Sequence, residues 1–213
     1  MGVPLHEFDV LELFGRDGTG HVQDYAKFVG SLEVWEIDRE WRPKLECNIP
    51  GARIKITDSF QEVRTTPTTY DLLVVDAPLA VTGTYCEHFD LFPHLFRICR
   101  ERSVLILNVI PSATSGDLKW WPNVFSPAHL ARRREFYGSI TPEQIALPEM
   151  ARRYARLADE NGFDCDWHFF QQRPGIMVYF VCHLTRRPGS PDDPPEDRAT
   201  RGSAADVSGS ERV

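Results

Sequence analysis

The stretch that decides the fold runs from Val10 to Gly20 and has the sequence VLELFGRDGTG. Its first half is an apolar run of strand length, and its second half is a turn that contains Gly15, Gly18 and Gly20. Glycine adopts positive φ angles at no steric cost and lets the backbone approach a bound molecule closely. Because apolar residues recur at helical spacing over residues 22–29, the stretch predicts a strand, a tight turn and a helix.

Three further apolar runs follow, and each ends in acidic or polar residues. The first ends in Glu-Ile-Asp at 36–38, the second in Asp-Ser-Phe at 58–60 and the third in Asp-Ala-Pro at 76–78. Open α/β sheets bind ligands outside the carboxyl ends of their strands. Strands that all end in this way predict a site for a nucleotide-like cofactor, and the details favour S-adenosylmethionine.

The glycine spacing is one of these details. Gly15, Gly18 and Gly20 follow the pattern G-x-x-G-x-G, whereas a nicotinamide-binding turn has G-x-G-x-x-G. The helix N-terminus behind the turn favours a negative group such as the methionine carboxylate of the cofactor. Asp17 and the loop backbone are expected to hold this methionine end. The alternative is that the glycines only form a tight turn between a strand and a helix.

The residues after the second strand suit the ribose. Glu36 lies about 20 residues beyond the turn, where a carboxylate can accept hydrogen bonds from both ribose hydroxyls. Ile37 is expected to line the cofactor beside it. Asp38 suits the N-terminal cap of the next helix instead.

The residues after the third and fourth strands suit the adenine and the reactive end. Asp58 can accept a hydrogen bond from the adenine amino group while Phe60 packs on the ring, and Ser59 is a further expected cofactor contact. An ordinary Asp-Ser loop is the alternative. Asp76 is expected to contact the cofactor near its reactive end and to be the catalytic residue; the alternative is an acid that begins a proline turn.

The pattern along the chain predicts a single α/β sheet. Strands and helices alternate up to residue 110, which is typical of a parallel sheet with crossover helices. The last two strands, at 164–171 and 176–184, have only four residues between them and can therefore pair only antiparallel. We expect a Rossmann-like, seven-stranded, mostly parallel sheet with a C-terminal antiparallel hairpin, an arrangement typical of methyltransferases. Helices are expected over 39–47, 89–99 and 148–162 as well as after the glycine turn.

The four strand-end segments resemble the class I S-adenosylmethionine-dependent methyltransferases, and within that fold the spermidine synthase branch. The residues Phe-Gly-Arg-Asp-Gly at 14–18 stand where that branch has Gly-Gly-Gly-Asp-Gly, and the likeness covers about residues 9–110. It implies that Glu36 holds the ribose, that Asp58 holds the adenine, and that Asp76 faces the reactive carbon of the donor.

Departures from that branch weigh against polyamine chemistry. Phe14 and Arg16 replace loop glycines, and Leu79 and Ala80 stand where a second acid is expected after Asp76. We also expect no β-rich domain of the kind that precedes the sheet in polyamine synthases. We therefore expect methyl transfer to a small or medium-sized acceptor. Aminopropyl or other alkyl transfer, and a non-catalytic cofactor-binding protein, are the alternatives.

The insert at residues 112–147 is the expected substrate lid. It carries aromatic residues beside three consecutive arginines at 132–134, and Trp120, Trp121 and Tyr137 are the expected substrate contacts. Aromatic rings can stack on a planar acceptor, and arginines can pair with a carboxylate or phosphate. The alternative is a surface helix that is packed by its aromatic residues.

Composition bounds the remaining possibilities. The 213 residues suit one domain at 1–185, followed by a tail at 186–213 that lacks aromatic residues and is expected to be disordered. A net charge of −7 makes nucleic acid an unfavourable partner. No apolar run is long enough to span a bilayer. The seven histidines are dispersed and predict no metal site, and five single cysteines suit reduced thiols in a cytoplasmic protein.

Overall fold

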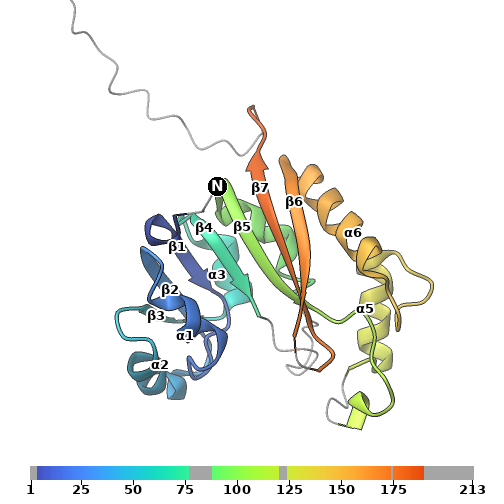
Figure 1. The fold of residues 1–213 in the computed structure, drawn as a ribbon, viewed down its shortest axis with the longest axis horizontal. Coiled ribbons are helices and arrows are strands. Elements are labelled where there is room, and N and C mark those ends of the chain that lie inside the picture. Colours follow the sequence, from blue (N-terminus) through green and yellow to red (C-terminus); the bar gives the residue numbers. More distant parts are fainter. Residues whose placement is uncertain (1–3, 77–87, 120–123, 174, 190–213) are drawn as a thin grey trace, which may run out of the picture.

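The computed structural model describes residues 4–76, 88–119, 124–173 and 175–189. These residues fold into one seven-stranded sheet with helices packed on it (Figure 1). The strand order is β3-β2-β1-β4-β5-β7-β6. Strands β1 to β5 pair in parallel, whereas β7 runs antiparallel to both β5 and β6. The strands are β1 (Asp9–Glu12), β2 (Ser31–Glu36), β3 (Arg53–Ile56), β4 (Tyr70–Val75), β5 (Cys99–Val109), β6 (Phe163–Gln172) and β7 (Val178–Arg186). The predicted fold class is confirmed.

Helices cover the sheet from two sides, and alternation along the strands decides which side chains each layer buries. Val10, Val34 and Val74 pack with α1 and α2 on one face. Leu11 and Trp35 pack on the other face, with α3 to α6. The helices are α1 (His21–Ala26), α2 (Arg42–Asn48), α3 (Ser59–Thr65), α4 (Phe92–Leu95), α5 (Pro127–Tyr137) and α6 (Leu147–Glu160). Short 3-10 turns are η1 (Leu5–Glu7), η2 (Arg39–Trp41), η3 (Phe96–Ile98) and η4 (Asp117–Lys119).

Some elements differ from the prediction. The helix α3 was not expected, and the helix expected over 89–99 is reduced to α4 and η3, with Cys99 already in β5. Strand β7 ends at Arg186, which pairs with Phe163 and lies one residue beyond the expected domain end at residue 185. Residues 190–213 of the expected tail lie outside the described residues.

Two aromatic rings of the insert expected to be a lid, those of Phe136 and Tyr137, lie in the core. Phe136 and Tyr137 on α5 are 9% and 7% exposed. The Phe136 ring stacks on Phe89 with centroids 4.4 Å apart, and the Tyr137 hydroxyl lies 2.7 Å from that of Tyr154 on α6. The alternative of a helix packed by its aromatic residues therefore describes α5 better than a substrate contact through Tyr137. Trp120 and Trp121 lie outside the described residues.

Arg133 on the same helix is fully buried. Its Nε donates a hydrogen bond to the carbonyl of Pro142 at 2.6 Å, and its Nη2 donates to the carbonyl of Ile110 at 2.8 Å. The guanidinium also lies over the ring of Phe125, 4.9 Å from its centroid. One side chain thereby joins the end of β5, the helix α5 and the segment that precedes α6.

Two further findings bear on the class of protein. Within the described ranges, no helix is long and apolar enough to cross a membrane. The cysteines that the structure describes are all free thiols, at positions Cys47, Cys99, Cys165 and Cys182.

Candidate functional site

The glycine loop after β1 is held against β2. The N–H of Gly15 donates to the carbonyl of Trp35 at 2.9 Å, and a Cβ at Gly15 would lie 2.2 Å from Val34 Cγ1, so close packing requires this glycine. Gly18 and Gly20 have φ angles of 72° and 80°, which favour glycine. Among the described residues, a Cβ at Gly20 would meet no atom within 4 Å, so they leave this part of the loop open.

Glu36 fixes the loop from the end of β2. Its side chain is buried, with one oxygen accepting from the N–H of Arg16 at 2.6 Å and the other from the N–H of Asp38 at 2.8 Å. Ile37 between these residues is 69% exposed. Asp38 accepts from the N–H of Glu40 at 2.9 Å and caps η2, as predicted.

Asp17 is occupied within its own turn. Its carboxylate accepts from the hydroxyl of Thr19 at 2.7 Å and from the Thr19 N–H at 3.2 Å. The hydrogen bond from this hydroxyl lowers the pKa of Asp17 below its ordinary value, which keeps the loop carboxylate ionised.

The segment after β3 has structural partners of its own. Asp58 accepts from the N–H of Phe60 at 2.9 Å and caps α3, while the Ser59 hydroxyl donates to the carbonyl of Leu13. The Phe60 ring is buried and lies 5.9 Å from that of Phe14. These contacts fasten α3 to the end of β1, next to the glycine loop. The adenine contacts expected of the three residues remain predictions.

Asp76, directly after β4, is the centre of a polar cluster drawn from four parts of the chain. Its Oδ1 accepts from Asn108 on β5 at 2.7 Å, and Arg173 donates to both carboxylate oxygens at 2.9 Å. The Tyr179 hydroxyl on β7 donates to Oδ2 at 3.0 Å, and the His21 Nδ1 lies 3.2 Å from the same oxygen. The side chain of Asp76 keeps 15% exposure.

Glu12 extends this cluster into the sheet. It is 1% exposed, and its Oε2 accepts from the Tyr25 hydroxyl at 2.6 Å and lies 3.1 Å from the His21 Nε2. Its Oε1 has no hydrogen-bond partner in the part of the chain that the structure describes. Burial raises the pKa of Glu12, although the hydrogen bond with His21 opposes this.

The pKa of His21 is also raised. Burial alone would lower it, but the hydrogen bond with Glu12 and the negative charges of Glu12 and Asp76 outweigh that effect. The pKa of the Tyr179 hydroxyl is raised by burial and by the charge of Asp76, so it stays a neutral donor. The cluster therefore holds one imidazole between two carboxylates at the carboxyl ends of β1 and β4.

Sequence reasoning identified Asp76 but none of its partners. Glu12 is an acid inside an apolar strand, and His21 follows Gly20 directly; both were visible local signals. Arg173 and Tyr179 gave no such signal, because they are 97 and 103 residues away from Asp76 in the sequence. In the described part of the chain, no group of acidic, histidine or cysteine side chains could hold a metal ion.

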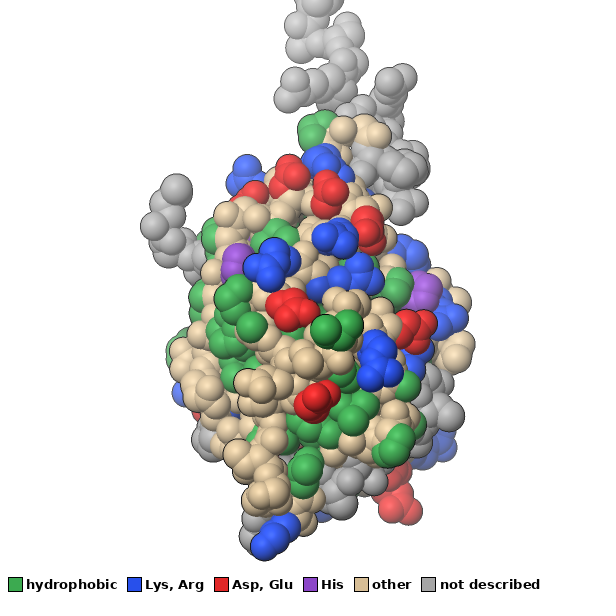
Figure 2. All heavy atoms as spheres, turned by 90° about the vertical axis from the view of Figure 1, so that its right-hand side faces the viewer, with side chains coloured by type: hydrophobic (Ala, Val, Ile, Leu, Met, Phe, Trp, Pro, Cys, Tyr) green, Lys and Arg blue, Asp and Glu red, His purple; other side chains and the backbone are tan. Residues whose placement is uncertain are grey.

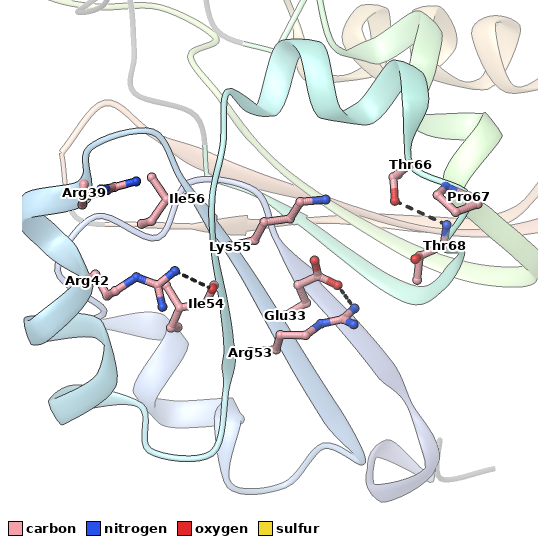
Figure 3. Close-up of a pocket in the computed structure, with 10 residues that line it drawn as sticks. All are labelled: Glu33, Arg39, Arg42, Arg53, Ile54, Lys55, Ile56, Thr66, Pro67 and Thr68. Carbon is pink, nitrogen blue, oxygen red and sulfur yellow. Dashed lines mark hydrogen bonds and ion pairs between the residues drawn. The ribbon is translucent and has the colours of Figure 1, made fainter.

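A concave surface lies along β3, the edge strand of the sheet (Figure 3). The cavity measures about 740 Å³ and is lined by Glu33, Arg39, Arg42, Arg53, Ile54, Lys55, Ile56, Thr66, Pro67 and Thr68. Its lining shares no residue with the Asp76 cluster. Two of the basic side chains that line this cavity are paired with acids: Arg53 with Glu33, and Lys55 with Glu62 at 2.6 Å. These carboxylates neutralise much of the positive charge of the cavity lining.

Comparisons with known proteins agree with the fold. No family model and no curated protein matches the sequence. A candidate RNA methyltransferase from Pyrococcus horikoshii aligns with a TM-score of 0.52 over 87% of this chain and 76% of its own, at 13% identity. The N-methyltransferase NodS from Bradyrhizobium japonicum WM9 aligns with a TM-score of 0.51 over 85% of this chain and 87% of its own, at 13% identity.

A candidate sarcosine dimethylglycine methyltransferase from Galdieria sulphuraria gives a similar result, with a TM-score of 0.51 over 86% of this chain and 80% of its own, at 13% identity. At this level of identity the likeness shows the fold alone. The sheet has the Rossmann-like methyltransferase fold.

Proposed function

We propose that this chain is an S-adenosylmethionine-dependent methyltransferase that acts on a small or medium-sized acceptor. The observation that carries the proposal is Glu36, a buried carboxylate that ties the end of β2 to the glycine loop. In sheets of this kind, a carboxylate here accepts hydrogen bonds from ribose hydroxyls. The methyltransferase fold supports the same assignment.

The residues of the loop and of β2 fit this cofactor. Each oxygen of Glu36 accepts one backbone hydrogen bond, and a carboxylate oxygen has two lone pairs, so Glu36 retains acceptor capacity for a ribose. The exposed Ile37 offers apolar contact beside it. The open space at Gly20 leaves room for a ligand at the loop, where Asp17 and the backbone of residues 15–20 would hold the methionine end.

The remaining assignments concern the adenine and the transfer itself. Asp58, Ser59 and Phe60 would form the adenine side of the site, next to the loop to which they are fastened. When bound, S-adenosylmethionine supplies an electrophilic methyl group on a sulfonium. The task of the protein is then to align the acceptor and to exclude water, because correct orientation removes a large part of the barrier.

Asp76 would orient the acceptor in this reaction. Its two oxygens already accept from Asn108, Arg173 and Tyr179 and face His21, so few lone pairs remain to take up a proton. This arrangement favours a positioning role over that of a general base.

The variant Asp76→Asn tests that role. We expect turnover to fall about tenfold. This loss is much smaller than the roughly 100-fold or greater loss that removal of a general base causes. Affinity for the neutral product S-adenosylhomocysteine should stay within a few-fold. Turnover is measured with a labelled methyl group and affinity by calorimetry. Normal turnover would remove Asp76 from the mechanism, and lost product binding would make it a cofactor-shell residue.

The charge of the protein bears on the class of acceptor. The net charge of −7 disfavours nucleic acid as an acceptor. On the face that Figure 2 shows, acidic and basic side chains are interspersed, so a small acceptor is favoured. The free, buried thiols of Cys99 and Cys182 support a cytoplasmic location. The test incubates the protein with methyl-labelled S-adenosylmethionine and a fractionated cell extract. Label in the small-molecule fraction supports the proposal, whereas label in RNA or protein contradicts the acceptor class. Turnover of a decarboxylated donor alone would indicate aminopropyl transfer.

A further inference from the structure

His21 is placed so that both of its ring nitrogens face carboxylate oxygens. Its Nδ1 lies 3.2 Å from Asp76 Oδ2, and its Nε2 lies 3.1 Å from Glu12 Oε2. An imidazole donates from both nitrogens only when it is protonated; in the neutral ring one nitrogen carries a lone pair. The geometry therefore suits an imidazolium held between two anions.

A protonated His21 balances the charge of the cluster around it. Glu12 on β1 and Asp76 after β4 are the two carboxylates, and Arg173 is the one other cation that contacts either of them among the described residues. Tyr25 on α1 and Tyr179 on β7 complete the surroundings as neutral hydroxyl donors. With His21 neutral, the cluster would carry one uncompensated negative charge next to the buried Glu12, which is costly.

Another cation near Asp76 can compensate the same negative charge as the proton on His21. We propose that His21 is a charge-compensating residue of the cofactor site, and that a ligand with a fixed positive charge beside Asp76 replaces the His21 proton. This inference rests on the proposed function, in which Asp76 orients the acceptor at the reactive end of S-adenosylmethionine and so lies beside its sulfonium. The product S-adenosylhomocysteine has a neutral sulfur and would leave the proton in place.

The two ligands should therefore differ in their pH dependence. Because the pKa of His21 is raised above its ordinary value of about 6.5, the ring is protonated in the free protein below that pH and for some interval above it. Rising pH removes the competing proton, so affinity for S-adenosylmethionine should strengthen relative to S-adenosylhomocysteine, by at most about tenfold per pH unit. The sulfonium charge lowers the pKa of the amino group of S-adenosylmethionine relative to that of S-adenosylhomocysteine, so each affinity is first corrected for the titration of the free ligand.

The experiment is titration calorimetry of both ligands between about pH 5.5 and 8.5, with His21→Gln and the control variant His183→Gln. His183 pairs with Asp166 at 2.7 Å on the β6–β7 hairpin, away from the Asp76 cluster, so its replacement should leave the pH dependence of the ratio as in the wild type. We expect the ratio of the two affinities to rise with pH in the wild type and in His183→Gln, and to be flat in His21→Gln. A flat ratio in the wild type, with both ligands bound, overturns this inference and leaves the proposed function intact. Binding of neither ligand at any pH overturns both.

A second measurement needs no variant. Nuclear magnetic resonance follows the titration of the His21 ring in the wild-type protein. We expect its pKa to lie above the ordinary value in the free protein, to fall when S-adenosylmethionine binds, and to be unchanged by S-adenosylhomocysteine. An ordinary or lowered pKa in the free protein, or equal shifts with both ligands, contradicts the proposal.

Discussion

Replacement of Arg133 by methionine should lower the free energy of unfolding by about 2–6 kcal/mol. The guanidinium is fully buried and donates to the carbonyls of Pro142 and Ile110. Methionine keeps the length of the side chain but leaves both acceptors without this donor, and an unsatisfied buried polar group costs about 1–3 kcal/mol. The guanidinium contact with the Phe125 ring is lost as well. Chemical denaturation followed by circular dichroism measures the effect.

The matched control is Arg134→Met, one residue further along α5. Arg134 is exposed, and a surface substitution of this kind changes stability by about 0.5 kcal/mol or less. If the two variants lose equal stability, Arg133 does not join the insert to the rest of the domain as described above.

Glu36→Ala should weaken the binding of S-adenosylhomocysteine about 10- to 100-fold. Charge-assisted hydrogen bonds of the kind expected between Glu36 and a ribose contribute about 1.5–3 kcal/mol. The variant also releases the N–H of Arg16, so the glycine loop loses its tie to β2. Both effects act in the same direction, and titration calorimetry measures their sum.

Asp38→Ala separates the two acids of this segment. Asp38 caps η2 through the N–H of Glu40, so its removal should cost about 1 kcal/mol of stability. It should leave affinity for S-adenosylhomocysteine within a few-fold. A larger loss of affinity in Asp38→Ala than in Glu36→Ala would exchange the roles that we assign to these residues.

The sheet was predictable because its determinants are local. Apolar runs of strand length predicted the strands, and β6 extends the predicted range of 164–171 by one residue at each end. The short link between the last two strands, predicted as four residues and five residues long between β6 and β7, allowed only antiparallel pairing. In contrast, α3 was missed because Asp58, Ser59 and Phe60 were interpreted as a ligand loop alone. The capping role of Asp58 was compatible with that interpretation and indicates where the helix begins.

The insert and the polar cluster needed tertiary information. Aromatic residues at helical spacing suit either a substrate surface or a core, and only the packing of Phe136 on Phe89 decides for the core. Likewise, Asp76 was recognised by its place after an apolar strand. Its partners Arg173 and Tyr179 arrive through the pairing of β7 with β5, which no local pattern describes.

Titration calorimetry of the wild-type protein with S-adenosylmethionine, S-adenosylhomocysteine and NAD tests the central claim most directly. We predict that both sulfur ligands bind at one site with micromolar dissociation constants and that NAD does not bind. Either sulfur ligand, at 100 times its dissociation constant, should also stabilise the fold by about 2.7 kcal/mol. Binding of NAD with no binding of either sulfur ligand would contradict the assignment of the strand-end site to S-adenosylmethionine.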